Sequence, residues 1–176
     1  MAGLDRSPGV DVPRGAIPVA LFLTANGSAV QGDSPQEMTE GAIECIAFQS
    51  AVAAAQRQGS GQATGRRTHE GISIRKPIDR SSPLLAKALC NNEAIEATFK
   101  FFRPNPSGDG TTEHYFTVEI ENGRVTRIHL VSPDGYANPG DPPFVAAFED
   151  VQFIYNEITW RYEVTGAEHS DTLNLR

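Results

Sequence analysis

The stretch that decides the fold covers residues 149–162 and reads EDVQFIYNEITWRY. Its first half places bulky side chains at the odd-numbered positions Val151, Phe153 and Tyr155. Its second half places them at the even-numbered positions Ile158, Trp160 and Tyr162. Alternation with a period of two is typical of a strand that has one buried face. The change of phase at Asn156 moves the apolar set to the other face, which predicts a bulge or two strands in tandem.

The same alternation predicts further strands upstream of this stretch. They are expected at residues 17–23, 42–49, 67–78, 94–103, 113–121 and 124–131. The dipeptide Asn122-Gly123 joins the last two and predicts a tight hairpin turn. Residues 51–55 are rich in alanine and favour a helix by propensity, although neither a cap nor a polar period supports one.

One helix is expected over residues 81–90. Ser82 is expected to cap it and Pro83 to occupy its first helical position. Its apolar face would consist of Leu84, Leu85, Ala88 and Leu89, and Asn91-Asn92 would end it. About seven or eight strands with one helix predict a mainly β protein, either a small antiparallel β-barrel or two packed sheets.

Length and composition favour one domain. The chain has 176 residues, of which 39% are hydrophobic, and this is enough for a sizeable core. Residues 1–16 contain two prolines and mixed charges and are expected to form a flexible leader. Residues 17–165 would form the domain, and residues 166–176 would form a loose polar tail.

The net charge of -7 argues against a nucleic-acid partner, which would require a basic surface. No apolar run approaches the ~20 residues that span a bilayer, so no stable membrane insertion is expected. The N-terminal residues lack the layout of a signal peptide, and synthesis in the cytoplasm is expected. Cys45 and Cys90 are expected to be buried, reduced thiols rather than a disulfide.

The sequence offers no recognisable catalytic motif: neither a GxSxG elbow, a P-loop nor HExxH occurs. The histidines His69, His114, His129 and His169 are scattered along the chain. His69-Glu70 and His114-Glu113 lie in expected strands, where adjacent side chains point to opposite faces and cannot converge on a metal. We therefore expect no catalytic residue, no cofactor and no metal, and the chain is not expected to be an enzyme.

The segment 57–67 is expected to be an exposed loop because it has three glycines and no apolar anchor. Its glycine spacing does not match the dinucleotide-binding fingerprint. The residues of interest in it are Arg57, Gly59, Gly61, Gly65, Arg66 and Arg67.

Two segments together resemble the haemolysin-coregulated protein (Hcp) family, the tube protein of type VI secretion systems. The first is a strand-to-helix passage with Lys76, Asp79, Ser82, Pro83, Leu84 and Leu85. The second is the closing stretch, with Glu149, Val151, Phe153, Tyr155, Ile158 and Trp160. Gly32-Asp33-Ser34 is a weaker match, because the family prefers Gly-Glu-Ser. The resemblance covers residues 17–165, and Trp160 is expected to be buried in the last strand.

The resemblance implies a tail-tube-like β fold that assembles into a homohexameric ring. Such rings stack into a tube that a contractile sheath propels behind a VgrG-like spike protein, and the lumen carries effectors. The protein would then be secreted by this route. The loop 57–67 would be the ring-stacking contact, and strand edges with the helix region 82–92 would form the subunit interface. Alternatives are a tail-tube subunit of another contractile injection system or phage-like particle, a monomeric β-barrel that binds a ligand, and an enzyme with an unrecognised site.

Overall fold

The structure is a computed structural model that describes residues 18–56, 63–132 and 146–173. These residues form ten strands and one helix, so the mainly β fold is confirmed. The elements in chain order are β1 (Val19–Ala25), β2 (Ser28–Val30), β3 (Ile43–Cys45), β4 (Ala47–Gln56), β5 (Ala63–Pro77), α1 (Ser81–Cys90), β6 (Ile95–Pro104), β7 (Thr112–Val131), β8 (Phe148–Ile154), β9 (Glu157–Tyr162) and β10 (Ala167–Thr172). The predicted leader 1–16 lies outside the described residues.

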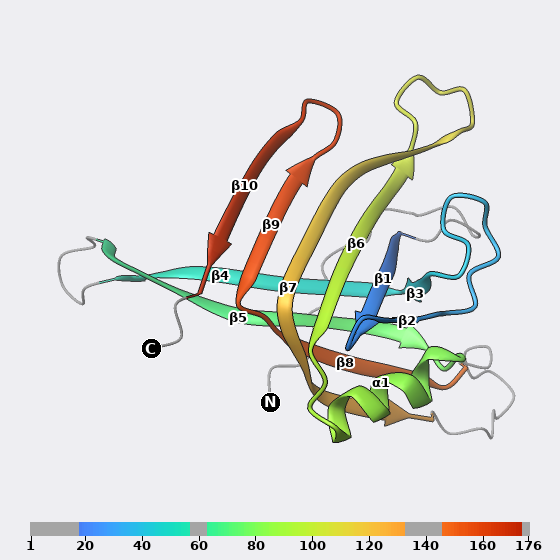
Figure 1. Ribbon diagram of the computed structural model, residues 1–176. Coiled ribbons are helices and arrows are strands. Elements are labelled where there is room, and N and C mark those ends of the chain that lie inside the picture. The colour runs from blue at the N-terminus through green and yellow to red at the C-terminus, as the bar shows by residue number, and fades with distance from the viewer. Residues whose placement is uncertain (1–17, 57–62, 133–145, 174–176) are drawn as a thin grey trace, which may run out of the picture.

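The strands form two antiparallel groups that cross each other (Figure 1). The first sheet contains β1, β2, β3, β6, β9, β10 and the first half of β7. The second sheet contains β4, β5, β8 and the second half of β7. Within the described residues β4 pairs with β5 along one side only, so the strands do not close into a continuous barrel. Of the two predicted architectures, the packed sheets are the observed one.

Strand β7 belongs to both sheets, and the predicted hairpin at Asn122-Gly123 is wrong. The chain bends there and continues, because Gly123 still pairs with Ile95 of the first sheet while Arg124 already pairs with Ile154 of the second. Asn122 has a positive φ of 48°. A Cβ at Gly123 would lie 2.7 Å from the carbonyl oxygen of Ile154, so the bend requires glycine.

The change of phase in residues 149–162 corresponds to two strands in tandem, as the sequence predicted. β8 lies in the second sheet and β9 in the first, and the chain passes from one to the other at Asn156. The side chains that close the gap between the sheets are buried: Val151, Phe153, Tyr155 and Ile158. The apolar side chains of β8 and those of β9 therefore face the same core from different sheets.

The core lies between the two sheets and contains a row of aromatic rings. The Phe99 ring on β6 lies 5.0 Å from the Phe48 ring on β4 and 6.0 Å from the Phe153 ring on β8 (centroid to centroid). Phe99 and Phe153 are almost fully buried, whereas Phe48 is half-buried. These rings connect strands of both sheets and hold the sheets together through apolar contact.

Two local expectations are corrected by the structure, and one open point is resolved. The alanine-rich segment 51–55, whose helical propensity had no support from a cap or a polar period, is part of β4, because pairing with β5 overrides that propensity. Residues 167–172 are strand β10 rather than a loose tail, since an edge strand needs only a ladder partner, here β9. Cys45 is buried and free as expected, but Cys90 is exposed at the end of α1.

Candidate functional site

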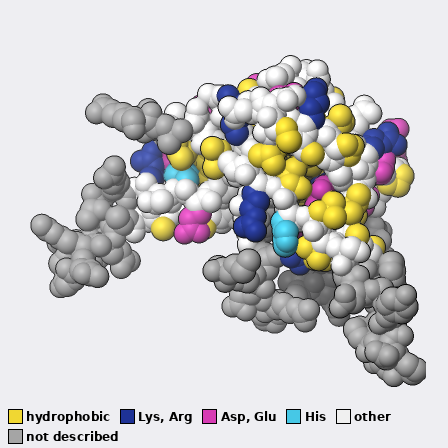
Figure 2. All heavy atoms as spheres, turned by 90° about the horizontal axis from the view of Figure 1, so that it is seen from below, with side chains coloured by type: hydrophobic (Ala, Val, Ile, Leu, Met, Phe, Trp, Pro, Cys, Tyr) yellow, Lys and Arg dark blue, Asp and Glu magenta, His cyan; other side chains and the backbone are white. Residues whose placement is uncertain are grey.

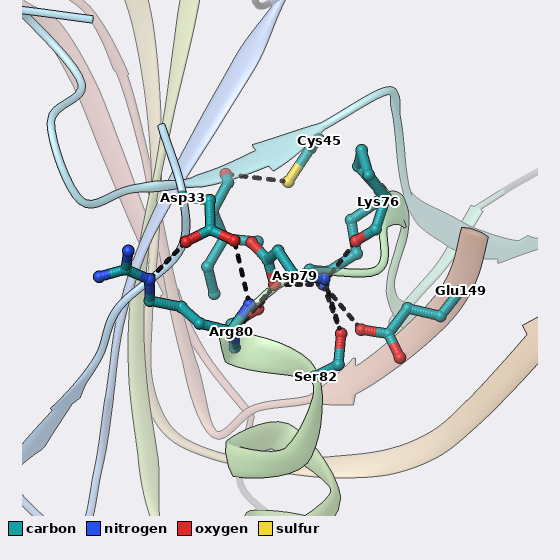
Figure 3. Close-up of polar contacts among 10 residues, drawn as sticks. Asp33, Cys45, Lys76, Asp79, Arg80, Ser82 and Glu149 are labelled. Atoms are coloured by element: carbon teal, nitrogen blue, oxygen red, sulfur yellow. Dashed lines mark hydrogen bonds and ion pairs between the residues drawn. The ribbon is translucent and has the colours of Figure 1, made fainter. Parts of the chain in front are cut away.

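The two segments that carry the family resemblance meet in space at the end of β5 and the start of α1 (Figure 3). Lys76 near the end of β5 is paired in register with Glu149 at the start of β8. The chain then turns, and Asp79 and Ser82 point back toward the Lys76 ammonium group. Residues 73 positions apart in the sequence thus form one polar cluster, which we call the lysine junction (Lys76, Asp79, Ser82 and Glu149).

Every proton of the Lys76 ammonium group finds an acceptor within this junction. Its Nζ lies 2.7 Å from Glu149 Oε1, 2.8 Å from Asp79 Oδ1, 2.8 Å from the Pro77 carbonyl oxygen and 3.1 Å from Ser82 Oγ. The side chains of Lys76 and Glu149 are 0% and 2% exposed. A charge can be buried this deeply only when it is paired and hydrogen-bonded, as it is here.

Asp79 connects the junction to the first turn of α1. Its Oδ1 accepts hydrogen bonds from the backbone N–H and the hydroxyl group of Ser81, at 2.9 Å and 2.5 Å. Burial alone would raise the pKa of Asp79, but the hydrogen bonds from Lys76 and Ser81 outweigh it and leave the pKa below its usual value. Asp79 therefore stays ionised beside Lys76 while it satisfies the helix start.

The predicted cap of α1 is shifted. The helix begins at Ser81, and Asp79 supplies the capping oxygen that was expected from Ser82. Ser82 instead accepts from the backbone N–H of Asp79 at 3.1 Å and from Lys76, and Pro83 lies inside the first turn. The end of the helix is as predicted, because Asn91 and Asn92 stop it and Asn92 has a positive φ of 51°.

The weak match Gly32-Asp33-Ser34 lies beside the same helix start. Asp33 pairs with the Arg80 guanidinium group and accepts from the Arg80 backbone N–H at 3.3 Å (Figure 3). A Cβ at Gly32 would lie 2.3 Å from the Ala42 carbonyl oxygen, so only glycine allows this close approach. All three matching segments therefore converge on one place in the fold.

The lysine junction has a structural role rather than a chemical one. A fully buried ammonium group cannot reach a substrate, and its partners are already engaged. Cys45 is also free and buried close by, and its burial raises the pKa of its thiol to about 12, against the opposing effect of Lys76. A thiol with that pKa is not a nucleophile near neutral pH.

A family profile described as "Type VI secretion system effector, Hcp" matches residues 22–162. The chain belongs to the Hcp family. Hcp proteins are type VI secretion tube or effector proteins, and they are secreted. The matched range contains the whole lysine junction and both sheets except β10 and the start of β1.

Individual relatives agree with this assignment. The "Major exported protein" of Pseudomonas aeruginosa is 35% identical over 141 residues, which is 80% of each chain. The solved structure of an Hcp1 double variant from E. coli EAEC 042 has a TM-score of 0.77 at 30% identity and covers 89% of this chain and 99% of its own. The secreted protein Hcp3 from Pseudomonas aeruginosa has a TM-score of 0.69 at 25% identity, covering 89% of this chain and all of its own.

The remaining Hcp motif residues lie mostly in the core. Leu85 on α1 is fully buried, whereas Leu84 is 39% exposed and Pro83 is exposed. Trp160 is half-buried rather than buried, because it lies near the edge of the first sheet between two histidine rings. The expectation that Trp160 is buried is therefore wrong, whereas its neighbour Ile158 on the same strand is fully buried.

Only part of the expected stacking loop of this Hcp protein lies within the described residues. Arg57, Gly59 and Gly61 lie outside the described residues. Gly65, Arg66 and Arg67 are part of β5, which begins at Ala63. The Arg67 guanidinium group is engaged with the carboxylate of Asp171 on β10.

His69 joins a hydrogen-bonded network that no sequence pattern predicts. Its Nε2 lies 2.9 Å from Asp171 Oδ2, and its Nδ1 lies 3.0 Å from the Tyr155 hydroxyl oxygen. Tyr155 is buried, and burial raises the pKa of its hydroxyl group, so the arrangement does not supply a nucleophile. This contact was not predicted because Asp171 was expected to lie in a loose tail.

Two further features lie on the surface of the described residues of this Hcp chain, an exposed apolar patch and a groove. Hydrophobic side chains gather on the face that carries α1, β8 and the end of β7 (Figure 2). A groove of about 810 Å³ crosses the second sheet and is lined by residues that include Gln49, Ser50, Gly71, Ser73, Gln152 and Ile154. In the described residues no helix is long and apolar enough to cross a membrane, and no three His, Cys, Asp or Glu side chains are grouped to hold a metal ion.

Proposed function

We propose that this chain is the subunit of a type VI secretion inner tube and that it acts by assembly rather than by catalysis. Six copies form a ring, and rings stack into a tube that a contractile sheath propels behind a VgrG-like spike protein. The lumen carries or chaperones effectors. The chain is made in the cytoplasm and leaves by this apparatus. Family membership supports the proposal, and the edge of β4 that no described strand pairs with is the structural observation that carries it.

Strand β4 has the features of an edge that another copy must cover. Its sequence AFQSAVAAAQ has no charged residue and no proline, and its residues 51–54 are exposed. Val52 at the centre is 44% exposed. Soluble proteins protect exposed edges with charged side chains, as β10 does with the exposed Glu168 at the edge of the first sheet. The β10 edge of the first sheet carries this protection and the β4 edge of the second sheet does not. This difference favours self-association through β4.

The helix region 82–92 extends the proposed contact. Leu85 and Ala88 face the core, whereas Leu84 is 39% exposed and the preceding Ile78 is 44% exposed. An exposed apolar pair next to a fixed helix start suits a contact with a neighbouring copy. The rigid lysine junction would hold this surface in place.

The outer face of the second sheet is the proposed wall of the lumen. A row across four strands is formed by Gln49, Ser73, Gln152 and Arg127, which are neighbours in register. Amide and hydroxyl groups dominate this row, and the groove of about 810 Å³ lies over it. A polar, mostly uncharged wall would not bind any particular cargo protein strongly. This property suits a channel that carries different cargo proteins.

Substitution of Val52 by glutamate tests the ring. Charge at the centre of the β4 edge should prevent pairing between copies, so the variant should stay at the 19.0 kDa of one chain in light scattering after gel filtration. The unchanged chain should give six times that mass. Val164→Glu is the matched control, because Val164 is 50% exposed far from β4 and its replacement should leave the ring intact.

Two outcomes separate the parts of this proposal. If the unchanged chain stayed a monomer at tens of micromolar, the ring itself would be wrong. If Val52→Glu assembled as well as Val164→Glu, the ring would stand but the β4 edge would not be its contact.

We also propose that the end of the β4–β5 hairpin, including residues 57–62 and Arg66, contacts the next ring of the stack. Arg66 is in β5 close to that end, and the net charge of -7 gives neighbouring rings an acidic surface for it to meet. Arg66→Glu should therefore leave the ring mass unchanged and abolish tubes in negative-stain images. Normal tubes in this variant would exclude the stacking role. Arg67 is not suitable for this test because it pairs with Asp171 within the chain.

A further inference from the structure

Strand β10 is attached to the protein in an unusual way. It pairs only with β9 in the described part of the chain, from Ala167 opposite Tyr162 to Thr172 opposite Glu157. Its side chains are exposed apart from Asp171, which is partly buried. A strand with so little apolar burial gains little from packing and depends on the few contacts that anchor it.

The main anchor is Asp171, which reaches from the first sheet to the second. Its carboxylate accepts hydrogen bonds from Nε and Nη2 of Arg67 and lies 2.9 Å from His69 Nε2, and both partners are on β5. The Asp171 and His69 side chains are only 11% and 3% exposed. His69 Nδ1 lies 3.0 Å from the Tyr155 hydroxyl oxygen, which extends the chain of contacts into the core. Bidentate contacts between arginine and a carboxylate are among the stronger hydrogen bonds in proteins.

Two aromatic contacts lie under this anchor. The Trp160 ring stacks on the His169 ring of β10 at 6.1 Å and 6°, and the His69 ring lies on it at 6.4 Å and 23°. Beyond β10, the Leu173 backbone N–H donates to the Asn156 carbonyl oxygen at 2.6 Å, and its side chain packs on the core. Residues 167–173 thus cover the chain's single tryptophan.

We propose that residues 167–173 form a releasable strap, locked by Asp171, that opens without unfolding of the two sheets. Opening removes the His169 ring from Trp160, exposes His69 and frees the hydrogen-bonding edge of β9. The inference does not depend on ring assembly, because every contact in it lies within one chain.

Amide hydrogen exchange on the full chain tests the strap at pH 7. Asp171→Asn keeps the shape of the side chain and removes its charge, so amides of residues 167–173 should exchange about 10-fold faster or more. Amides in the centre of β6 should keep their protection. Trp160 fluorescence should shift to longer wavelength as the ring becomes more exposed to water. Arg67→Gln should give the same local result from the β5 side.

Glu168→Gln is the matched control. Glu168 lies on the same strand and pairs with Arg161 of the neighbouring β9, so it does not connect the sheets. Its replacement should change exchange of residues 167–173 by less than about 2-fold, as for an exposed ion pair. Equal effects of Asp171→Asn and Glu168→Gln would overturn the lock. Equal acceleration in β6 and β10 would overturn the separate opening, because the sheets would then unfold with the strap.

Acid offers a second readout of the same lock. The hydrogen bonds from Arg67, opposed by burial and aided by His69, lower the pKa of Asp171 to about 2 from a value of 3.8. The titratable groups that face its carboxylate are Arg67 and His69 on β5, with Tyr155 behind them. A lowered carboxyl pKa stabilises the closed strap above about pH 4, and this stability is lost as pH falls toward 2. Trp160 fluorescence of the unchanged chain should shift in that window, and Asp171→Asn should show no such step.

Discussion

Replacement of Lys76 by methionine should lower the free energy of unfolding by about 3–5 kcal/mol. The ammonium group is 0% exposed and pairs with Glu149 and Asp79, so its loss leaves the buried Glu149 carboxylate and the partly buried Asp79 carboxylate without their cation. That cost is a large part of the roughly 5–15 kcal/mol that stabilises a domain. Urea unfolding followed by circular dichroism would measure it, and ring formation and secretion should fail with the fold.

The neighbouring pair provides a matched control. Arg75 and Asp150 lie on the same two strands, one position away and on the other face, with side chains 32% and 22% exposed. Arg75→Met should cost no more than about 1 kcal/mol, as for other solvated pairs. A Lys76→Met change that cost no more than Arg75→Met would contradict the structural role of the junction. Combining Lys76→Met with Glu149→Leu should recover much of the loss, because no unpaired charge then remains on β8.

Replacement of Phe99 by alanine should cost about 3–5 kcal/mol. Phe99 is 0% exposed and its ring contacts Phe48 on one side and Phe153 on the other, so the change leaves a cavity between the two sheets. Thermal and urea unfolding would measure the loss.

Phe102→Ala is the control for Phe99, because Phe102 is on the same strand and is only half-buried. It should destabilise the protein clearly less than Phe99→Ala. Equal losses at the two positions would mean that the Phe99 site collapses around the smaller side chain instead of leaving a cavity.

Strands with a buried face were predictable from the sequence because their side chains alternate. The alternation in residues 149–162 predicted two strands and the point where the chain passes between the sheets. The pattern of residues 81–90 predicted the helix. The predictions from the sequence were wrong where pairing between distant segments decides the structure. The Asn122-Gly123 dipeptide is a hairpin signal by itself, but its flanking residues pair with Ile95 and Ile154, which are distant in sequence. Local propensity carries no information about such partners.

Edge strands escaped prediction for a related reason. Residues 167–172 have no apolar face, and residues 51–54 include three alanines, so neither shows the alternation that marks a strand. The lysine junction was predictable only in part. Lys76, Asp79, Ser82 and Glu149 all belong to segments that resemble the Hcp family, but their convergence depends on the register of β5 and β8. The contact of Asp171 with His69 could not be expected once the tail was taken to be loose.

The passage of β7 through both sheets has a mechanical consequence. Its 20 residues form one uninterrupted strand, paired with β6 and β9 over one half and with β8 over the other. A load applied to one sheet therefore reaches the other through covalent backbone and not only through side-chain contacts. The sheets cannot slide past each other without breaking ladder hydrogen bonds on both sides of Gly123. The two sheets are therefore expected to move together when either one is loaded.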